Sequence, residues 1–350
     1  ATPIILSGLQ RLEYRGYDSA GIAVMQGDEI AIRRDVGKLS NLLQRVSDAP
    51  LNGRIGIGHT RWATHGVPSP RNAHPHISRS GRTVVVHNGI VENFRELRAE
   101  LEADGVQFAS ETDTEVIVHL IQRERDAGFP LVEAVRCAVL RLRGAHAIVV
   151  LSADEPDRLV AVRIGNAGGV ALGLGDGEMF IASDIPAILE HTRRMVFLEN
   201  RQMATITRDA YHVQTLEGMA VDAEIHPIAW DPVSAARGEY KHFMQKEIHE
   251  QARALTDTLG DRIDFNNGCV TLPDLEISPE RAQRLKRIVT VACGTSAYSG
   301  LVGKFILEDL TRLPVEVDYG SEYRYRNPIL DEDCAVLAIT QSGETVDTLA

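Results

Sequence analysis

The stretch His146-Ala-Ile-Val-Val-Leu-Ser-Ala-Asp-Glu-Pro-Asp-Arg-Leu-Val-Ala-Val-Arg-Ile164 decides the fold class of the first part of the chain. Its two short apolar and β-branched runs flank a turn rich in Asp and Pro, which predicts two strands. Similar runs occur at Arg54–Gly58, Thr83–Val86 and Met179–Ala182. Two adjacent helices interrupt the strands. Because strands group with strands and helices with helices, the pattern up to about residue 215 predicts α+β layers rather than a doubly wound sheet.

The two predicted helices lie in the middle of this part. The first begins at Thr112-Asp113-Thr114-Glu115, a capping-box pattern, and stops at Gly128. The second runs from Leu131 to about Arg143 and stops at Gly144. Residues 216–285 are more polar and predict an interdomain connector with helical pieces, the longest over Glu239–Leu259.

A different pattern begins at about residue 286. Arg287–Ala292 predicts a buried strand, and an amphipathic helix follows through Leu301, Phe305, Ile306 and Leu310. Short strands at Val315–Val317 and Cys334–Thr340 complete a strand, helix, strand alternation, which is typical of a parallel α/β sheet.

Composition excludes several classes of protein. The 350 residues are 44% hydrophobic and 25% charged, which is ordinary for a globular chain. The net charge of −12 disfavours binding to the DNA backbone. No uncharged apolar run approaches the roughly 20 residues that span a bilayer. Four scattered cysteines and the lack of a signal-peptide pattern predict reduced thiols in a cytoplasmic protein.

Two Ser/Thr/Gly loops in the last part are candidates for binding phosphate. Each follows a predicted strand and opens a helix, and helix N-termini present unpaired N–H groups to anions. Thr295, Ser296, Ser342 and Thr345 add hydroxyl donors, and Gln341 adds an amide. The alternative is that both loops are ordinary βα turns with helix-capping residues. Convergence of two such loops at one sheet edge favours a phosphate site.

Polar side chains gather between the early strands. Five histidines fall between residues 59 and 87, but their spacing does not favour a metal, and His74, His76 and His87 are interpreted as hydrogen-bonding residues. Arg61 is suited to a carboxylate, although a surface arginine is the alternative. Asp113 either stabilises a helix start or binds a ligand ammonium. A ligand with both groups would be an amino acid.

Asn88-Gly89 follows a predicted strand and has two interpretations, one functional and one structural. The pair can supply a side-chain and a backbone N–H to an oxyanion hole. It is also the strongest short signal for a hairpin turn.

Seven longer motifs resemble the glutamine–fructose-6-phosphate aminotransferase family. They occur in the family's order and cover the whole chain, at Leu12–Gly21, His59–Gly66, His87–Gly89, Ser110–Glu115, Tyr240–Ile248, Cys293–Ser296 and Gln341–Thr345. The resemblance implies a class II glutamine amidotransferase domain of the N-terminal-nucleophile type over 1–215. It also implies a connector over 216–285 and the first part of a sugar isomerase (SIS) domain over 286–350.

The resemblance also implies a reaction. Glutamine is hydrolysed, and its ammonia passes through a channel to a second site, where fructose 6-phosphate becomes glucosamine 6-phosphate. No metal, flavin or nicotinamide cofactor is implied, and a cytoplasmic homodimer is expected for the full-length protein. Nucleic acid and membrane are not expected partners.

Individual residues receive roles by match to the family motifs. Arg61 is expected to hold the glutamine carboxylate and Asp113 its ammonium, with Thr64 and His65 lining the pocket. Asn88 and Gly89 should form the oxyanion hole, and Trp62 should gate the ammonia channel. The sugar-phosphate residues are Thr295, Ser296, Gln341, Ser342 and Thr345.

The chain departs from the family pattern at both ends. The family's nucleophile is an N-terminal Cys, whereas this chain begins with Ala1 and its first cysteine is Cys137. About ten residues, including the nucleophile, are expected before Ala1. Most of the isomerase half is expected after Ala350. The chain is therefore interpreted as an inactive internal piece of a longer synthase.

Two other interpretations remain open. The first is a shortened, non-catalytic module that binds glutamine or a sugar phosphate. The second is another class II amidotransferase, such as the phosphoribosyl type, although the chain has two Ser/Thr phosphate loops and no ribosyl-pyrophosphate motif.

Overall fold

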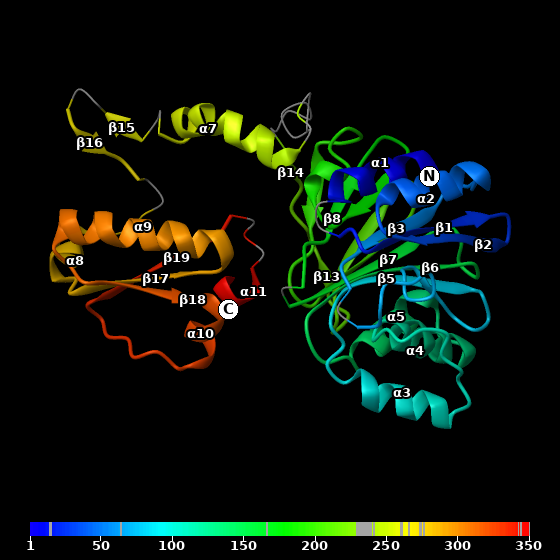
Figure 1. The fold of residues 1–350 in the computed structure, drawn as a ribbon. Helices are drawn as coiled ribbons and strands as arrows, with labels where there is room; N and C mark the ends of the chain where they lie inside the picture. Colours follow the sequence, from blue (N-terminus) through cyan, green and yellow to red (C-terminus); the bar gives the residue numbers. More distant parts are fainter. Residues whose placement is uncertain are drawn as a thin grey trace. The chain divides into compact units, whose positions relative to one another are not determined.

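The computed structural model describes residues 1–350 except 14–15, 64, 166, 229–239, 241, 260–261, 265–266, 273–274, 276, 342, 344 and 350. The chain divides into two compact units, Ala1–Ala236 and Arg237–Ala350 (Figure 1). No helix in the described ranges is long and apolar enough to cross a membrane.

The first unit is a layered α+β structure. Its helices are α1 (Thr2–Leu12), α2 (Leu39–Asp48), α3 (Phe94–Ala103), α4 (Glu115–Asp126), α5 (Leu131–Val139) and the short 3-10 helix η2 (Ile185–Ala187). Its strands are β1 (Ser19–Gln26), β2 (Glu29–Val36), β3 (Gly56–Arg61), β4 (His76–Ile77), β5 (Thr83–Gly89), β6 (His146–Ser152), β7 (Leu159–Ile164), β8 (Ala171–Leu174), β9 (Met179–Ala182), β10 (Arg194–Phe197), β11 (Gln202–Ile206), β12 (Tyr211–Thr215), β13 (Ala220–Val221) and β14 (His226–Pro227).

These strands form three antiparallel sheets. The strand orders are β2-β1-β3, β14-β10-β8-β9 and β13-β12-β11-β7-β6-β5-β4. In Figure 1, α1 and α2 lie against the sheet of β1–β3, while α4 and α5 lie against the seven-stranded sheet. The sheets of the first unit therefore include two short strands that come after residue 215.

Strand β1 shows why the layers hold together. Ile22 and Val24 pack towards α2, against Leu39 and Leu42. The alternate residues Ala23 and Met25 belong to a second cluster, shared with Ile57, Val84, Val86 and Leu151 of β3, β5 and β6. Because successive strand residues face opposite sides, β1 is buried between a helical layer and a sheet.

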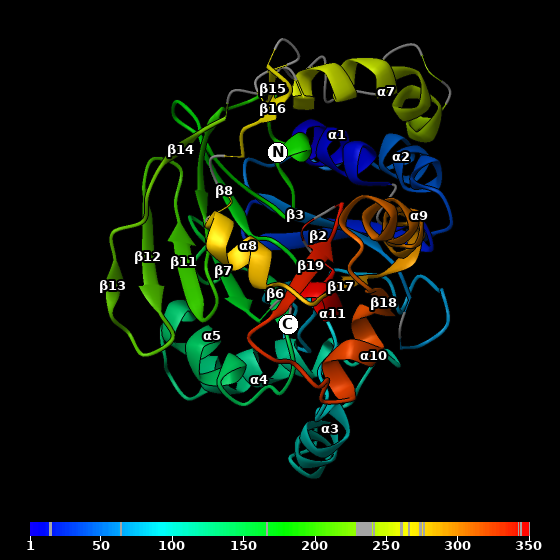
Figure 2. The same cartoon turned by 90° about the vertical axis from the view of Figure 1, so that its left-hand side faces the viewer.

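The second unit contains a small parallel sheet. Its elements are α7 (Phe243–Leu259), β15 (Ile263–Asp264), β16 (Cys269–Val270), α8 (Pro279–Arg284), β17 (Arg287–Ala292), α9 (Gly294–Thr311), β18 (Val315–Tyr319), α10 (Gly320–Tyr325), β19 (Cys334–Ile339) and α11 (Val346–Leu349). Strand β17 pairs in parallel with β18 on one side and β19 on the other. Helix α9 packs along β17 and β18 (Figure 2), so the predicted parallel alternation is confirmed.

Three local predictions are wrong. The first unit has more than two helices, since α1, α2 and α3 were not predicted. Helix α5 ends at Val139 rather than near Arg143. In α9 the side chains Leu301, Phe305, Ile306 and Leu310 are exposed, and the small residues Ala297 and Gly300 are buried instead. A Cβ on Gly300 would lie 2.8 Å from Thr290 Cγ2, so glycine allows the helix to approach the sheet.

Candidate functional site

Arg61 is the last residue of β3, and its guanidinium is fixed inside the first unit. The residue is 4% exposed. Its Nη2 donates to the backbone carbonyls of His65 and Gly66, the second at 3.2 Å. Its Nη1 is buried and has no hydrogen-bond partner among the described residues. Burial lowers the pKa of Arg61, while the carboxylates of Asp113 and Asp18 oppose this effect. The Arg61 guanidinium is therefore a fixed cation whose Nη1 makes no hydrogen bond with the described residues.

Asp113 lies immediately before α4 and is also 4% exposed. Its Oδ2 accepts a hydrogen bond from the backbone N–H of Val91 at 2.8 Å, and its Oδ1 lies 4.0 Å from His65 Nδ1. Among the described residues, no ion pair joins Asp113 to Arg61, although the two charges interact. Two opposite buried charges thus share one region without being paired to each other.

The predicted capping box at 112–115 is wrong. The N-cap of α4 is Thr114, and its side chain makes no capping hydrogen bond. Glu115 reaches back instead to the backbone N–H groups of Ala109, at 2.7 Å, and Ser110, at 2.6 Å. It also receives Ser110 Oγ at 2.5 Å and faces His119. The carboxylate therefore fixes the segment that leads to Asp113.

Asn88 and Gly89 end strand β5 rather than forming a hairpin turn. They pair with Ala147 and His146 of β6. Asn88 Nδ2 donates to the carbonyl of Ala167 at 2.6 Å. Gly89 has φ +138°, and a Cβ there would lie 2.2 Å from the carbonyl oxygen of Ala145. Only glycine fits this position, and it lies two residues before Val91, which binds Asp113.

The remaining predicted glutamine-site residues differ in exposure. His65 contacts Phe94 edge to face, with ring centroids 5.1 Å apart, and lies beside Asp113. Trp62 is 59% exposed, and its ring lies 5.3 Å from that of Tyr17. Thr64 lies outside the described residues. The structure therefore brings Arg61, His65 and Asp113 together and leaves Trp62 at the surface.

The histidines form a hydrogen-bonded and stacked cluster, which confirms their interpretation as structural residues. His76 Nε2 lies 3.0 Å from Thr112 Oγ1, and His74 Nδ1 accepts from the backbone N–H of His87. His87 Nδ1 lies 2.8 Å from Thr114 Oγ1 and its Nε2 lies 3.1 Å from His146 Nδ1. Burial lowers the pKa of His74, His76 and His87. These rings therefore stay neutral near pH 7.

Sequence reasoning did not assign two supporting residues. Asp18 Oδ2 accepts from the backbone N–H of Ala63 at 2.7 Å, and so holds the chain next to Arg61. His146 joins β6 to His87. Asp18 lies within one of the motifs that carry the family resemblance, which was an available signal. His146 gave no local signal, because its role depends on strand pairing.

The described sugar-phosphate candidates lie in the second unit at one edge of its sheet. Thr295 and Ser296 are in the first turn of α9, and Thr345 precedes α11. Gln341 follows β19 and is exposed, while Ser342 lies outside the described residues. Because β17 and β19 are adjacent and parallel, their two loops meet at the same edge. Thr348 Oγ1 lies 3.6 Å from Cys293 Sγ and links them.

Cys137, the first cysteine of the chain, does not resemble an activated nucleophile. All four thiols are free. Cys137 lies on α5, and its Sγ is 3.6 Å from Glu133 Oε1. Burial and the nearby Glu133 carboxylate raise the pKa of Cys137, whereas an activated thiol needs a lowered pKa.

Two protein families match the chain. One, described as a glutamine amidotransferase domain, matches residues 40–227, and the other, described as a SIS domain, matches residues 283–350. The chain belongs to the glutamine amidotransferase family. The predicted fold class, an α+β sandwich of the N-terminal-nucleophile type followed by an α/β SIS domain, is confirmed.

Curated relatives make the similarity more specific. The chain is 52% identical, over 350 residues, to the glutamine–fructose-6-phosphate aminotransferase (isomerizing) of Symbiobacterium thermophilum. It is 47% identical to the protein of the same name from Clostridium tetani. Both matches cover 100% of this chain and 57% of the relative. The chain thus spans little more than half the length of these relatives.

Solved structures agree on the fold alone. The glutamine phosphoribosylpyrophosphate amidotransferase from B. subtilis matches with a TM-score of 0.55 and 20% identity. That match covers 94% of this chain and 66% of the other.

Proposed function

We propose that this chain carries the glutamine site and part of the sugar-phosphate site of a glutamine–fructose-6-phosphate aminotransferase. The overall reaction converts L-glutamine and D-fructose 6-phosphate into L-glutamate and D-glucosamine 6-phosphate. Family membership and the names of the relatives support this proposal. Since the chain spans 57% of those relatives, the complete reaction is proposed for the longer protein.

The observation that carries the proposal is the pair of Arg61 and Asp113. A buried charge without a close partner is costly, and a ligand of complementary charge removes this cost. An α-amino acid carries a carboxylate for the unused Nη1 of Arg61 and an ammonium for Oδ1 of Asp113. His65 and its sequence neighbour Thr64 would line the same pocket. The site thus selects a free amino acid by the charges of its α-carboxylate and its α-ammonium group.

The oxyanion role proposed for Asn88 and Gly89 follows from their place on β5. Attack on the glutamine amide generates a negative oxygen, which needs N–H donors held in advance. Strand pairing with β6 holds these two residues, and Asn88 Nδ2 is a donor. An N-terminal Cys would be the attacking group by resemblance to the family, and none of the four cysteines here is at the first position.

The released ammonia would then reach the sugar-phosphate site. Trp62, which is exposed, is proposed to gate this passage. Helix α9 has 18 residues, and its N-terminus offers backbone N–H groups beside Thr295 and Ser296. The β19 loop would add Gln341, Ser342 and Thr345. The domain division at 215 and 285, the homodimer and the cytoplasmic location belong to the same proposal.

Calorimetric titration of the chain with L-glutamine tests the amino-acid site. D113N keeps the shape and an oxygen for the Val91 N–H, but removes the charge. We expect the Kd for glutamine to rise by about tenfold or more, since charge-assisted hydrogen bonds are worth roughly 1.5–3 kcal/mol. D126N, at the exposed end of α4, is the matched control. Equal affinities of wild type and D113N, or no binding by wild type, would refute the assignment.

A further inference from the structure

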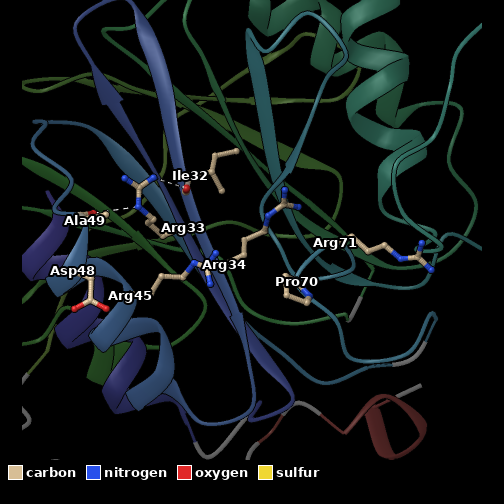
Figure 3. A pocket seen from close by; sticks show the side chains of 8 residues that line it. All are labelled: Ile32, Arg33, Arg34, Arg45, Asp48, Ala49, Pro70 and Arg71. Carbon is tan, nitrogen blue, oxygen red and sulfur yellow. Dashed lines mark hydrogen bonds between the residues drawn. The ribbon is translucent and has the colours of Figure 1, made fainter.

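One cavity of the first unit is lined by arginines. It has a volume of about 660 Å³ and lies between β2, the end of α2 and the loop at 70–71 (Figure 3). Four of its eight lining residues are Arg33, Arg34, Arg45 and Arg71. Small-molecule sites have volumes of roughly 300–1,000 Å³, so the cavity can hold a metabolite. Such a cluster of cations is notable in a chain with a net charge of −12.

Arg33 and Arg34 make no ion pair with a carboxylate among the described residues, although the charge of Glu115 acts on Arg34. Arg33 donates through Nε to the carbonyl of Ala49 at 3.2 Å and through Nη1 to that of Ile32 at 2.9 Å. Arg34 donates through Nη1 to the carbonyl of Ala73 at 3.2 Å. These bonds fix both side chains but leave N–H groups of each guanidinium free. Backbone carbonyls thus hold the arginines without neutralising their charge.

The other two arginines, Arg45 and Arg71, are more exposed, and each makes an ion pair at the surface. Arg45 Nη1 lies 3.4 Å from Asp35 Oδ2, and its side chain is 53% exposed. Arg71 pairs with Glu111, and both side chains are more than half exposed. Exposed ion pairs of this kind contribute little and exchange partners readily. The acidic residue among the eight, Asp48, accepts a hydrogen bond from Gln44.

The lining also has an apolar part. Ile32, Ala49 and Pro70 contribute carbon surface next to the guanidinium groups. Guanidinium groups bind phosphate oxygens in pairs, and several of them together suit a multiply charged phosphate. We propose that this arginine pocket binds a small phosphorylated metabolite, with its phosphates on Arg33 and Arg45 and its organic part against Ile32 and Pro70. This site is separate from Arg61 and Asp113 and from the loops of the second unit.

Titration of the chain with inorganic pyrophosphate tests the proposal. R45Q is the main variant, because the side chain of Arg45 is half exposed and its loss should not disturb folding. We expect R45Q to weaken pyrophosphate binding by about tenfold, as loss of one charge-assisted contact does. R33Q should weaken it at least as much. R208Q removes a more exposed arginine that does not line the pocket, and should bind as wild type does.

Several outcomes would overturn the proposal. One is that pyrophosphate fails to bind to wild type, and another is that R45Q, R33Q and R208Q bind it equally. Equal or tighter binding of citrate would show that the pocket does not select phosphate. Circular dichroism melts of each variant separate a lost contact from a lost fold. Glutamine binding measured on R45Q should be unchanged, so failure here and failure of the glutamine site are distinguishable.

Discussion

Mild acid should destabilise the first unit through its buried histidines. Burial and the nearby Arg61 charge lower the pKa of His59 to about 4, against about 6.5 in an unfolded chain. Below about pH 6.5, His59 therefore binds a proton in the unfolded state but not in the folded state. The free energy of unfolding is highest above both pKa values and falls as the pH drops below about 6.5.

The size of this effect follows from the pKa difference. For His59 alone, lowering the pH from 7.5 to 5.5 should reduce the free energy of unfolding by about 1 kcal/mol. The pKa values of His74, His87 and His146 are also lowered by burial, so the whole cluster should lose more than this. Protonation of Glu115 does not contribute to the change in unfolding free energy between pH 7.5 and 5.5. Burial raises its pKa, but hydrogen bonds from His119 and Ser110 leave it lowered overall.

Urea unfolding at a series of pH values measures the effect. H59N removes the titrating ring and should reduce the loss of unfolding free energy between pH 7.5 and 5.5 by about 1 kcal/mol. H212Q changes an exposed histidine of β12 and should keep the wild-type slope. The reasoning is refuted if wild type loses less than about 0.5 kcal/mol over this range, or if H59N and H212Q have the same slope.

Three further changes test other parts of the structure. G89A should destabilise the first unit by at least about 2 kcal/mol and reduce glutamine binding, whereas G105A, at φ +85° in open space, should cost about 1 kcal/mol; denaturant unfolding compares them. E115Q should cost about 2–3 kcal/mol in the same assay, because it weakens a buried carboxylate that accepts two backbone N–H groups; a loss below about 0.5 kcal/mol contradicts this role. S296A should weaken fructose 6-phosphate binding in calorimetry, and unchanged affinity would make the α9 loop structural only.

Local sequence patterns were sufficient to predict several strands, central ones and an edge strand among them. β7 and β9 match the predicted ranges, and β17 does as well. The missed helix α2 also has a local signal, since Leu39, Leu42 and Val46 recur at helical spacing and are buried. That helix was therefore predictable. It was missed because the strand patterns received more weight than this helical spacing.

Other errors came from tertiary contacts that no local pattern contains. Glu115 has the spacing of a capping box, but four described groups hold it elsewhere: the backbone N–H groups of Ala109 and Ser110, Ser110 Oγ and His119 Nε2. The apolar residues of α9 have helical spacing, yet Gly300 allows the opposite face to approach β17. In both cases the packing of neighbouring elements decided between two locally acceptable arrangements.

The glutamine site was assigned by resemblance, because its residues come from separate elements. Arg61 ends β3, whereas Asp113 precedes α4, and their approach depends on how the sheets and helices pack. Spacing alone allowed a surface arginine and a helix cap. The burial of both side chains without a mutual ion pair, among the described residues, supports the proposed ligand site over those alternatives.

The buried polar cluster explains how the site can stay rigid without its ligand. His87 joins Thr114, next to Asp113, to the strand that carries Asn88 and Gly89. Glu115 fixes the segment before Asp113, and Asp18 fixes the segment after Arg61. Each of these partners is itself hydrogen-bonded, so the charged groups keep their positions at the cost of burying many polar atoms. The same cluster that makes the unit sensitive to acid thus holds the groups that an amino acid would bind.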